Sequence, residues 1–435
     1  MKTSALNWFS LSVYSSLLAA LLFISGCASM SINMHATANQ LKHSKNVEQT
    51  YLTVSQATCK SHSQVECDLN LGYLALMSGR FDEAITSLES AKQQMKALSA
   101  TSFVETTVAL TINETGRSFE GTPTDKVLLH SMMALAYLMK SDLDGARVEV
   151  LQADVAMNAL AKKDSSSGQL IFMHFLSGII YEINDEADNA LISYRRAYSL
   201  LNKGTTPVPE ALQLALLKHT AALGLNNEYD QFKDQFGERV VAEAKLPSKH
   251  FYIYFDGVVS QLINNQTTLW WPVDEVYLSV ALPKFPNNYY QPTSAKLSWQ
   301  SQTMQTHVIE DLELRVRDDL NDEMPKLSAA ALARAATKYK AVKSAQEQDS
   351  MLGAFANVLT IISEQADIRQ WAVLPSSMQV ARNDLSLESE GGSNDGFVDI
   401  NIIVNNQPQT VTLNSERYSV VLAADISPYI FHSEF

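Results

Sequence analysis

The N-terminal half of the chain shows helical periodicity of apolar positions, interrupted by short polar turns. Three alanines, Ala84, Ala146 and Ala190, mark equivalent places in this pattern. A small residue stands twelve positions before each alanine, a larger apolar or aromatic residue four positions after it, and a further alanine seven positions after it. These residues are Gly72, Ala134 and Gly178; Leu88, Val150 and Tyr194; and Ala91, Ala153 and Ala197. The spacing predicts three similar helical hairpins whose small residues allow close helix contact.

This arrangement is similar to the tetratricopeptide repeat, in which small residues on both helices pack against each other. The alanines are 62 and 44 residues apart, so insertions lengthen the usual unit of about 34 residues. Residues 207–237 contain one further helical pair, which we expect to cap the array. The predicted repeat domain covers residues 41–246.

The first helix of each predicted hairpin would line the concave surface of the array. A surface of this kind binds an apolar segment, which comes either from a protein partner or from the same chain. The sequence leaves both alternatives open. Six apolar positions make up this candidate interaction groove: Tyr73, Met77, Leu135, Met139, Ile179 and Ile183.

After residue 247 the pattern changes to short runs rich in β-branched and aromatic residues. Strands are predicted over residues 251–257, 275–282, 371–374 and 378–381, and a hairpin is predicted between residues 397–404 and 410–413. A helical insertion is expected from about residue 310 to 365. The predicted fold class is therefore a tetratricopeptide-like helical array followed by an α+β domain over residues 247–435.

One segment of the helical insertion, residues 351–362, is apolar around nearly the whole circumference of a helix. Twelve residues at 1.5 Å per residue extend about 18 Å, which is too short for a hydrocarbon core of about 30 Å. We expect this helix to be buried in its own domain. Docking onto the repeat groove or onto a partner is the alternative.

The first 26 residues have the pattern of a bacterial lipoprotein signal peptide. Lys2 precedes an apolar stretch from Leu11 to Phe23, and small residues then lead to Cys27. In such a lipobox the cysteine becomes the acylated N-terminus of the mature chain. The residues after Cys27 lack the aspartate typical of inner-membrane retention. We therefore predict a lipid-anchored, periplasm-facing protein of the bacterial outer membrane, with residues 27–40 as a tether.

Charge and cysteine content agree with this location. The chain of 435 residues has 33 Lys and Arg against 47 Asp and Glu, which gives a net charge of -14. This balance argues against nucleic acid or an anionic lipid surface as the main partner, because both require a basic surface. Cys59 and Cys67 remain as a pair once Cys27 is acylated, and we predict a disulfide between them in the oxidising periplasm.

Catalytic and metal-binding motifs are missing from the sequence. None of the nine histidines lies in a His-Glu-x-x-His motif, and there is no Gly-x-Ser-x-Gly elbow or phosphate-binding loop. The acidic pairs Glu310–Asp311, Asp318–Asp319 and Asp322–Glu323 are interpreted as the solvated face of a polar helix. We predict no catalytic residues, no metal site and no cofactor.

The segment Asp367-Ile-Arg369-Gln-Trp371-Ala-Val-Leu-Pro375 resembles a motif of a family of uncharacterised bacterial outer-membrane lipoproteins with tetratricopeptide-like repeats. The family pattern has Thr and Ser where this chain has Ile and Gln. The resemblance implies an outer-membrane lipoprotein without an assigned activity, and it singles out Asp367, Arg369, Trp371 and Pro375, whose role is open. Asp367 and Arg369 stand two residues apart before a predicted strand, where they can pair above Trp371.

Taken together, the sequence predicts a non-enzymatic scaffold that binds an envelope protein, in cell-wall or surface-polymer assembly. A second hypothesis is a carrier that binds a lipid or a glycan, for which Trp270–Trp271 and Tyr289–Tyr290 would supply stacking surfaces. A cell-wall enzyme is a third hypothesis, which the missing catalytic motifs disfavour.

Overall fold

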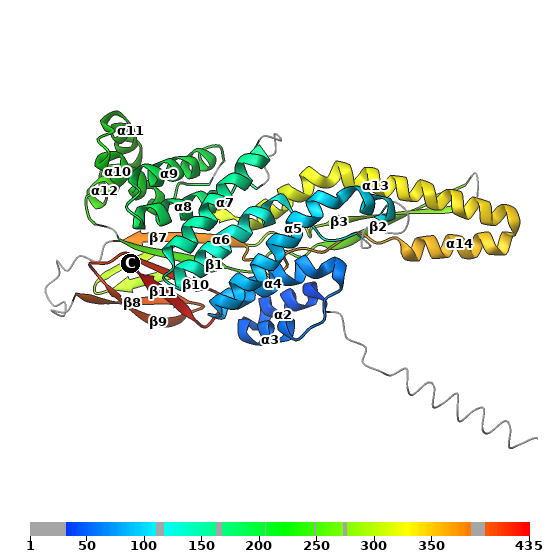
Figure 1. Cartoon of the computed structure of the whole chain (residues 1–435), viewed down its shortest axis with the longest axis horizontal. Helices are drawn as coiled ribbons and strands as arrows, with labels where there is room; N and C mark the ends of the chain where they lie inside the picture. Colours follow the sequence, from blue (N-terminus) through cyan, green and yellow to red (C-terminus); the bar gives the residue numbers. More distant parts are fainter. Residues whose placement is uncertain are drawn as a thin grey trace, which may run out of the picture.

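The computed structural model describes residues 32–109, 117–161, 168–204, 206–247, 249–272, 276–383 and 396–435. Within these ranges, helical hairpins cover one side of a β-sheet region, and an arm extends away from this body (Figure 1). The fold is therefore a helical array followed by an α+β region, as predicted. The predicted signal peptide and Cys27 lie outside the described residues.

The array contains the three predicted hairpins. Gly72 lies against Leu88 and Gly178 lies against Tyr194, so that a Cβ atom at either glycine would come within 2.5 Å of the facing side chain. These glycines therefore permit the close helix contact inferred from the pattern. The hairpins are α4 (Gln64–Met77) with α5 (Phe81–Ala109), α6 (Pro123–Met139) with α7 (Leu143–Ala161), and α8 (Ile171–Ile183) with α9 (Ala187–Leu201).

Short helices precede the first hairpin. They are α2 (Met34–Ser44), α3 (Val47–Ser55) and the 3-10 helix η1 (Ser61–Ser63). Ala38 and Leu41 are buried, so residues from Met34 onward belong to the folded array rather than to the predicted tether of residues 27–40. The structure confirms the predicted disulfide between Cys59 and Cys67, which ties the segment before η1 to α4.

The last helices of the array follow the third hairpin. The predicted pair in residues 207–237 is present, and a short helix extends it. These helices are α10 (Glu210–Ala222), α11 (Asn226–Phe236) and α12 (Glu238–Glu243). Helix α10 lies next to α9 and also contacts the central sheet, so the end of the array is joined to the α+β region.

The central sheet has five strands, in the order β11-β10-β1-β7-β6. Strand β1 is buried on both faces, because Phe255 packs against Tyr73 and Phe172 of the array while Tyr254 packs against a second sheet. The strands are β1 (His250–Asp256), β6 (His307–Asp311), β7 (Ser377–Asn383), β10 (Ser419–Ala424) and β11 (Ile430–Glu434).

The second sheet has four strands, in the order β5-β4-β8-β9. Its last hairpin confirms the predicted turn, since Asn405 and Asn406 have φ values of 53° and 61°, in the left-handed region that a two-residue hairpin turn requires. The strands are β4 (Lys296–Trp299), β5 (Gln302–Gln305), β8 (Phe397–Val404) and β9 (Gln407–Asn414).

One strand prediction in the α+β region was wrong. Residues 371–374 form no strand but a buried irregular segment, in which Trp371 is 2% exposed. The predicted helical insertion is present and runs from Leu312 to Ser363, within two residues of the expected bounds at each end. Residues 307–311 before it form β6 beside β7.

The arm consists of a long helical hairpin and a two-stranded ribbon (Figure 1). Asp349 ends its first helix, and its side chain accepts the backbone N–H groups of Met351 and Leu352 at the start of the second. The elements are α13 (Leu312–Gln348), α14 (Ser350–Ser363), β2 (Ile263–Trp271) and β3 (Val276–Lys284). In the part of the chain that the structure describes, no helix combines the length and apolarity needed to cross a membrane.

Candidate functional site

The predicted interaction groove is filled by the chain itself. All six groove residues are at most 8% exposed, and they share one core with the central sheet. The Ser427 hydroxyl also donates a hydrogen bond to the backbone carbonyl of Met77, over 2.8 Å. The hypothesis that this groove receives a partner was therefore wrong, and the alternative of filling by the same chain is correct. The apolar periodicity could not distinguish the two, because it shows only that a face must be covered.

A buried ion pair joins the third hairpin of the array to the central sheet. Arg382 on β7 donates to both carboxylate oxygens of Glu182 on α8, at 3.0 and 2.5 Å, and both side chains are almost fully buried. Burial raises the pKa of Glu182, but the charges of Arg382 and Lys218 outweigh this effect and hold the pKa well below its usual range. The array and the sheet are thus joined by charge pairing as well as by apolar contact.

Two acidic side chains of the α+β region cap helices of the array. Glu310 on β6 accepts the backbone N–H groups of Ile171 and Phe172 at the start of α8, at 2.6 and 3.2 Å. Asp319 on α13 accepts the N–H of Thr124 at the start of α6, at 3.2 Å. Both are buried, at 2% and 1% exposure, so their interpretation as part of a solvated face was wrong. Helix N-termini leave N–H groups that carboxylates satisfy well.

The segment singled out by the family resemblance is a clamp between the two regions. Arg369 pairs with Asp367 at 2.9 and 2.5 Å, as predicted, and also donates to the backbone carbonyls of His62 and Arg117 in the array, each at 2.5 Å. Trp371 is buried in the shared core, and Pro375 is buried as well. These residues therefore hold the irregular segment onto the first repeat, which is a structural role.

The two aromatic pairs proposed as stacking surfaces, Trp270–Trp271 and Tyr289–Tyr290, do not form a shared binding surface. Trp270 lies on the arm, where its ring centroid is 4.6 Å from that of Tyr277, and the side chain of Trp271 lies outside the described residues. Tyr289 is 57% exposed and contacts the Arg317 guanidinium, whereas the Tyr290 ring packs on Gly257. Neither pair lines the cleft described next.

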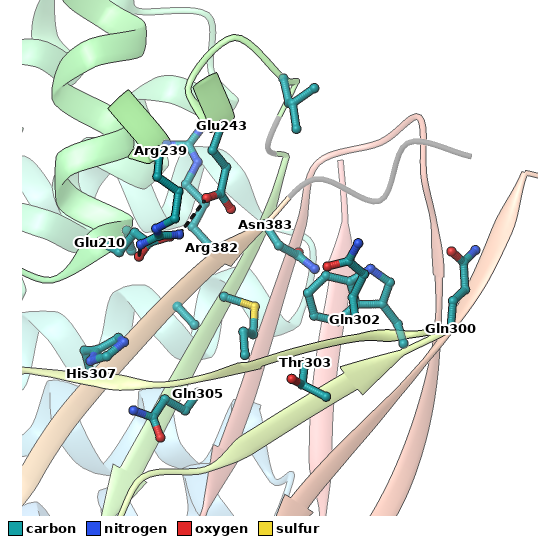
Figure 2. A pocket seen from close by; sticks show the side chains of 15 residues that line it. Glu210, Arg239, Glu243, Gln300, Gln302, Thr303, Gln305, His307, Arg382 and Asn383 are labelled. Carbon is teal, nitrogen blue, oxygen red and sulfur yellow. Dashed lines mark hydrogen bonds and ion pairs between the residues drawn. The ribbon is translucent and has the colours of Figure 1, made fainter. Parts of the chain in front are cut away.

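A polar cleft of about 600 Å³ lies between the last helices of the array and the two larger sheets (Figure 2). No local motif in the sequence marks this cleft, because its lining comes from segments far apart in the chain. The lining residues are Glu210, Ala211, Arg239, Glu243, Leu246, Trp299, Gln300, Gln302, Thr303, Met304, Gln305, His307, Ala381, Arg382 and Asn383.

At one end of the cleft, Arg239 bridges two carboxyl groups. One guanidinium nitrogen lies 2.9 Å from Glu210 and 3.3 Å from Glu243 (Figure 2). Burial and the neighbouring charge of Glu210 raise the pKa of Glu243 to about 7. The hydrogen bond from Arg239 lowers the pKa of Glu210. Because both carboxyl groups accept from the same guanidinium nitrogen, they sit side by side, whereas glycoside hydrolysis needs them on either side of a scissile bond.

The exposed face of α14 is the second surface with unassigned chemistry. Met351, Leu352, Val358 and Leu359 are 80%, 55%, 52% and 50% exposed. Residues seven apart lie on the same side of a helix, so these four form one apolar stripe. The prediction that this helix is buried in its own domain was therefore wrong for this stripe. Only the opposite side is fixed, where the Asn357 amide bonds the backbone of β3.

Within the described ranges, no group of three or more His, Cys, Asp or Glu side chains is arranged to hold a metal ion.

Comparison with known proteins gives a remote likeness in fold. No protein-family model matches the chain, and no curated protein matches it. TPR-like repeats of a kinesin light chain-like protein from Podosopora anserina share 16% identity over 46% of this chain and 90% of that one, with a TM-score of 0.32. BtubC (BKLC) from P. vanneervenii shares 15% identity over 45% of this chain and 70% of that one, with a TM-score of 0.31. Likenesses this remote concern the type of fold alone, and the resemblance to envelope lipoproteins stays a prediction.

Proposed function

We propose that the protein is a non-enzymatic scaffold, anchored by Cys27 in the bacterial outer membrane and facing the periplasm, which holds an envelope protein on the apolar stripe of α14. The stripe carries this proposal. The groove, where a repeat array usually binds its ligand, is occupied by the sheet, so a partner must bind elsewhere. A continuous apolar stripe on a projecting arm is costly in water and is typical of an interaction surface.

The charge around the stripe indicates the chemistry of the partner. The segment from Lys326 to Glu364 carries five basic and three acidic residues, and Glu364 pairs with Arg334 and Lys338, although the chain as a whole has a net charge of -14. Lys340 is exposed on α13, next to α14 in the helical hairpin. The partner surface that fits is therefore an apolar patch with an acidic rim. A role in cell-wall or surface-polymer assembly follows if the partner belongs to such a complex.

Site-specific photocrosslinking in the native envelope tests this surface. A photoreactive residue at Leu352 should give an adduct with one distinct protein, and Leu359→Asp should abolish that adduct without lowering the melting temperature. Val155 on α7, an apolar residue that is 69% exposed, is the matched control position. Equal labelling from both positions, or adducts only with lipid or with a second copy of the chain, would contradict the proposal.

The anchor is tested separately. Cys27→Ser should give a form that no longer partitions with the outer membrane, because the acyl chains supply the membrane affinity. Unchanged partitioning of this variant would contradict the lipoprotein assignment and leave the crosslinking result intact.

A further inference from the structure

The polar cleft contains a buried amide whose hydrogen-bonding groups are largely unused. Asn383, the last residue of β7, is 2% exposed, and neither its side-chain oxygen nor its side-chain nitrogen has a hydrogen-bond partner among the residues that the structure describes. Tyr252 lies beside it, and its hydroxyl is also unpartnered. An amide side chain has two donors and two acceptor positions, so even a bond to Tyr252 would leave most of them unused. Buried polar groups left in this way indicate a missing ligand or water.

Strand alternation turns this amide toward the second sheet. The preceding residue, Arg382, points to the array, where Glu182 binds it, so the next side chain along the strand points to the opposite face, and both residues line the cleft. Figure 2 shows the Asn383 amide extending from the strand toward the region of Gln302. The amide therefore lies in the wall of the cleft, where a small shift of the side chain presents its unused groups to a bound molecule.

A hairpin supplies the other wall. Trp299 and Gln302 face each other in the β4–β5 register, and Trp299 is only partly buried against the second core, so part of its ring remains open to the cleft. Gln300 at the turn has a φ of 50°, an uncommon conformation for a residue other than Gly, Asn or Asp. Thus an aromatic ring and several amides lie along one edge of the cleft.

The charges in the cleft suit an uncharged ligand. Arg239 is occupied by Glu210 and Glu243, and Arg382 is occupied by Glu182. A phosphate would need a cationic cluster, and a lipid tail would need mostly apolar walls. Neutral amides, two carboxyl groups and an aromatic face instead match the hydroxyl groups and the apolar ring face of a sugar.

We propose that this cleft binds a glycan built of N-acetylated sugars. The acetamido carbonyl accepts from the Asn383 amide nitrogen, a sugar hydroxyl donates to the Asn383 amide oxygen, and the sugar ring stacks on Trp299. A volume of about 600 Å³ lies in the range of ligand sites and admits a short segment of such a chain. This site is remote from α14 in the sequence and independent of the proposed scaffold role.

Titration of the purified full-length chain in detergent with two matched tetrasaccharides tests the inference. Chitotetraose and cellotetraose share the β-1,4 linkage and differ in the acetamido group. We expect saturable binding of chitotetraose in calorimetry, with a change in Trp fluorescence, and at least about tenfold weaker binding of cellotetraose. No saturable binding of chitotetraose, or equal affinity for both sugars, would overturn the proposal.

Variants of the chain separate the site from general effects. Asn383→Leu and Trp299→Ala should each weaken chitotetraose binding at least about tenfold, whereas Tyr289→Ala, at an exposed aromatic residue outside the cleft, should not change it. If Asn383→Leu lowers the melting temperature, Gln302→Ala on the exposed rim of the cleft replaces it as the test of binding. Unchanged affinity in Gln302→Ala and Trp299→Ala, or tighter binding of tetra-alanine than of chitotetraose, would contradict a glycan site. Neither result depends on crosslinking from Leu352.

Discussion

The wall of the repeat groove and the outer stripe of α14 are both apolar helix surfaces, yet only the first is covered. In the groove, residues such as Tyr73 and Ile179 are fully buried against the sheet. On α14, Met351 and Leu359 are at least half exposed. The difference lies in the polar groups around each surface. The groove is surrounded by charged groups with matching partners in the same chain. Helix α14 is held on its inner side by a few hydrogen bonds, such as those of the Asn357 amide with β3 and of Gln266 with the Ile361 carbonyl.

This contrast shows how one chain combines a fixed interface with an open one. Carboxylates, arginines and helix ends of the array and the sheet satisfy one another, so separation of the two regions would leave many buried groups unpaired. The outer stripe of α14 has no such requirement. We therefore expect substitutions at the first surface to change stability and substitutions at the second to change binding.

The largest effect is expected from Glu182→Ala. This change removes the carboxylate that neutralises the buried Arg382 and should lower the free energy of unfolding by about 3–5 kcal/mol. Chemical denaturation measures it. Arg196→Ala is the control, because its pair with Asp154 is largely exposed and should contribute no more than about 1 kcal/mol. If both variants lowered the free energy of unfolding equally, the buried pair would contribute no more to stability than a surface pair.

The next effect concerns pH. Burial lowers the pKa of His174 on α8 to about 4, whereas an unfolded chain has a histidine pKa of about 6.5. Between these values the unfolded chain binds a proton that the folded chain does not, so stability is lost as the pH falls from about 6.5 to 4. His174→Asn should reduce this loss by an amount on the order of 3 kcal/mol. Parallel stability–pH curves for variant and wild type would show that burial of His174 has no such effect.

A smaller effect is expected at the clamp. Arg369→Ala removes the bonds to Asp367 and to the carbonyls of His62 and Arg117 and should cost about 2 kcal/mol. Arg369→Lys should recover only part of this, because lysine cannot reproduce the planar, multidentate geometry. Thermal melting checks both, with the more exposed Arg147 as the control position. Full recovery by lysine would indicate that charge alone matters here.

The smallest effect on stability is expected on the arm. Leu352→Asp should change the free energy of unfolding by no more than about 0.5 kcal/mol, because this side chain is already in water. Val342→Asp on α13, where the valine is 2% exposed, should destabilise the arm strongly because it buries a charge. Hydrogen exchange of the arm amides distinguishes them. Similar destabilisation by both would mean that the stripe belongs to a core.

Much of the local structure followed from the sequence. The positions of Gly72 and Ala84 relative to each other predicted the helical hairpins, and Asn405–Asn406 predicted the last turn, because each depends on contacts close in the chain. The disulfide between Cys59 and Cys67 was predictable for the same reason. The polar cleft was not, because Asn383, Trp299 and Glu210 belong to segments that only folding brings together.

What covers each surface was decided by the tertiary structure. Periodicity determined that the groove and residues 351–362 are apolar. It could not show that the sheet covers the groove, or that one side of the helix at residues 351–362 stays exposed. It also placed Glu310 and Asp319 on a polar helix, although long-range packing makes them caps for α8 and α6. The physical reason is that hydrophobic burial is non-directional. An apolar pattern in the sequence shows that a surface must be covered. Only the packing of the whole chain determines which other surface covers it.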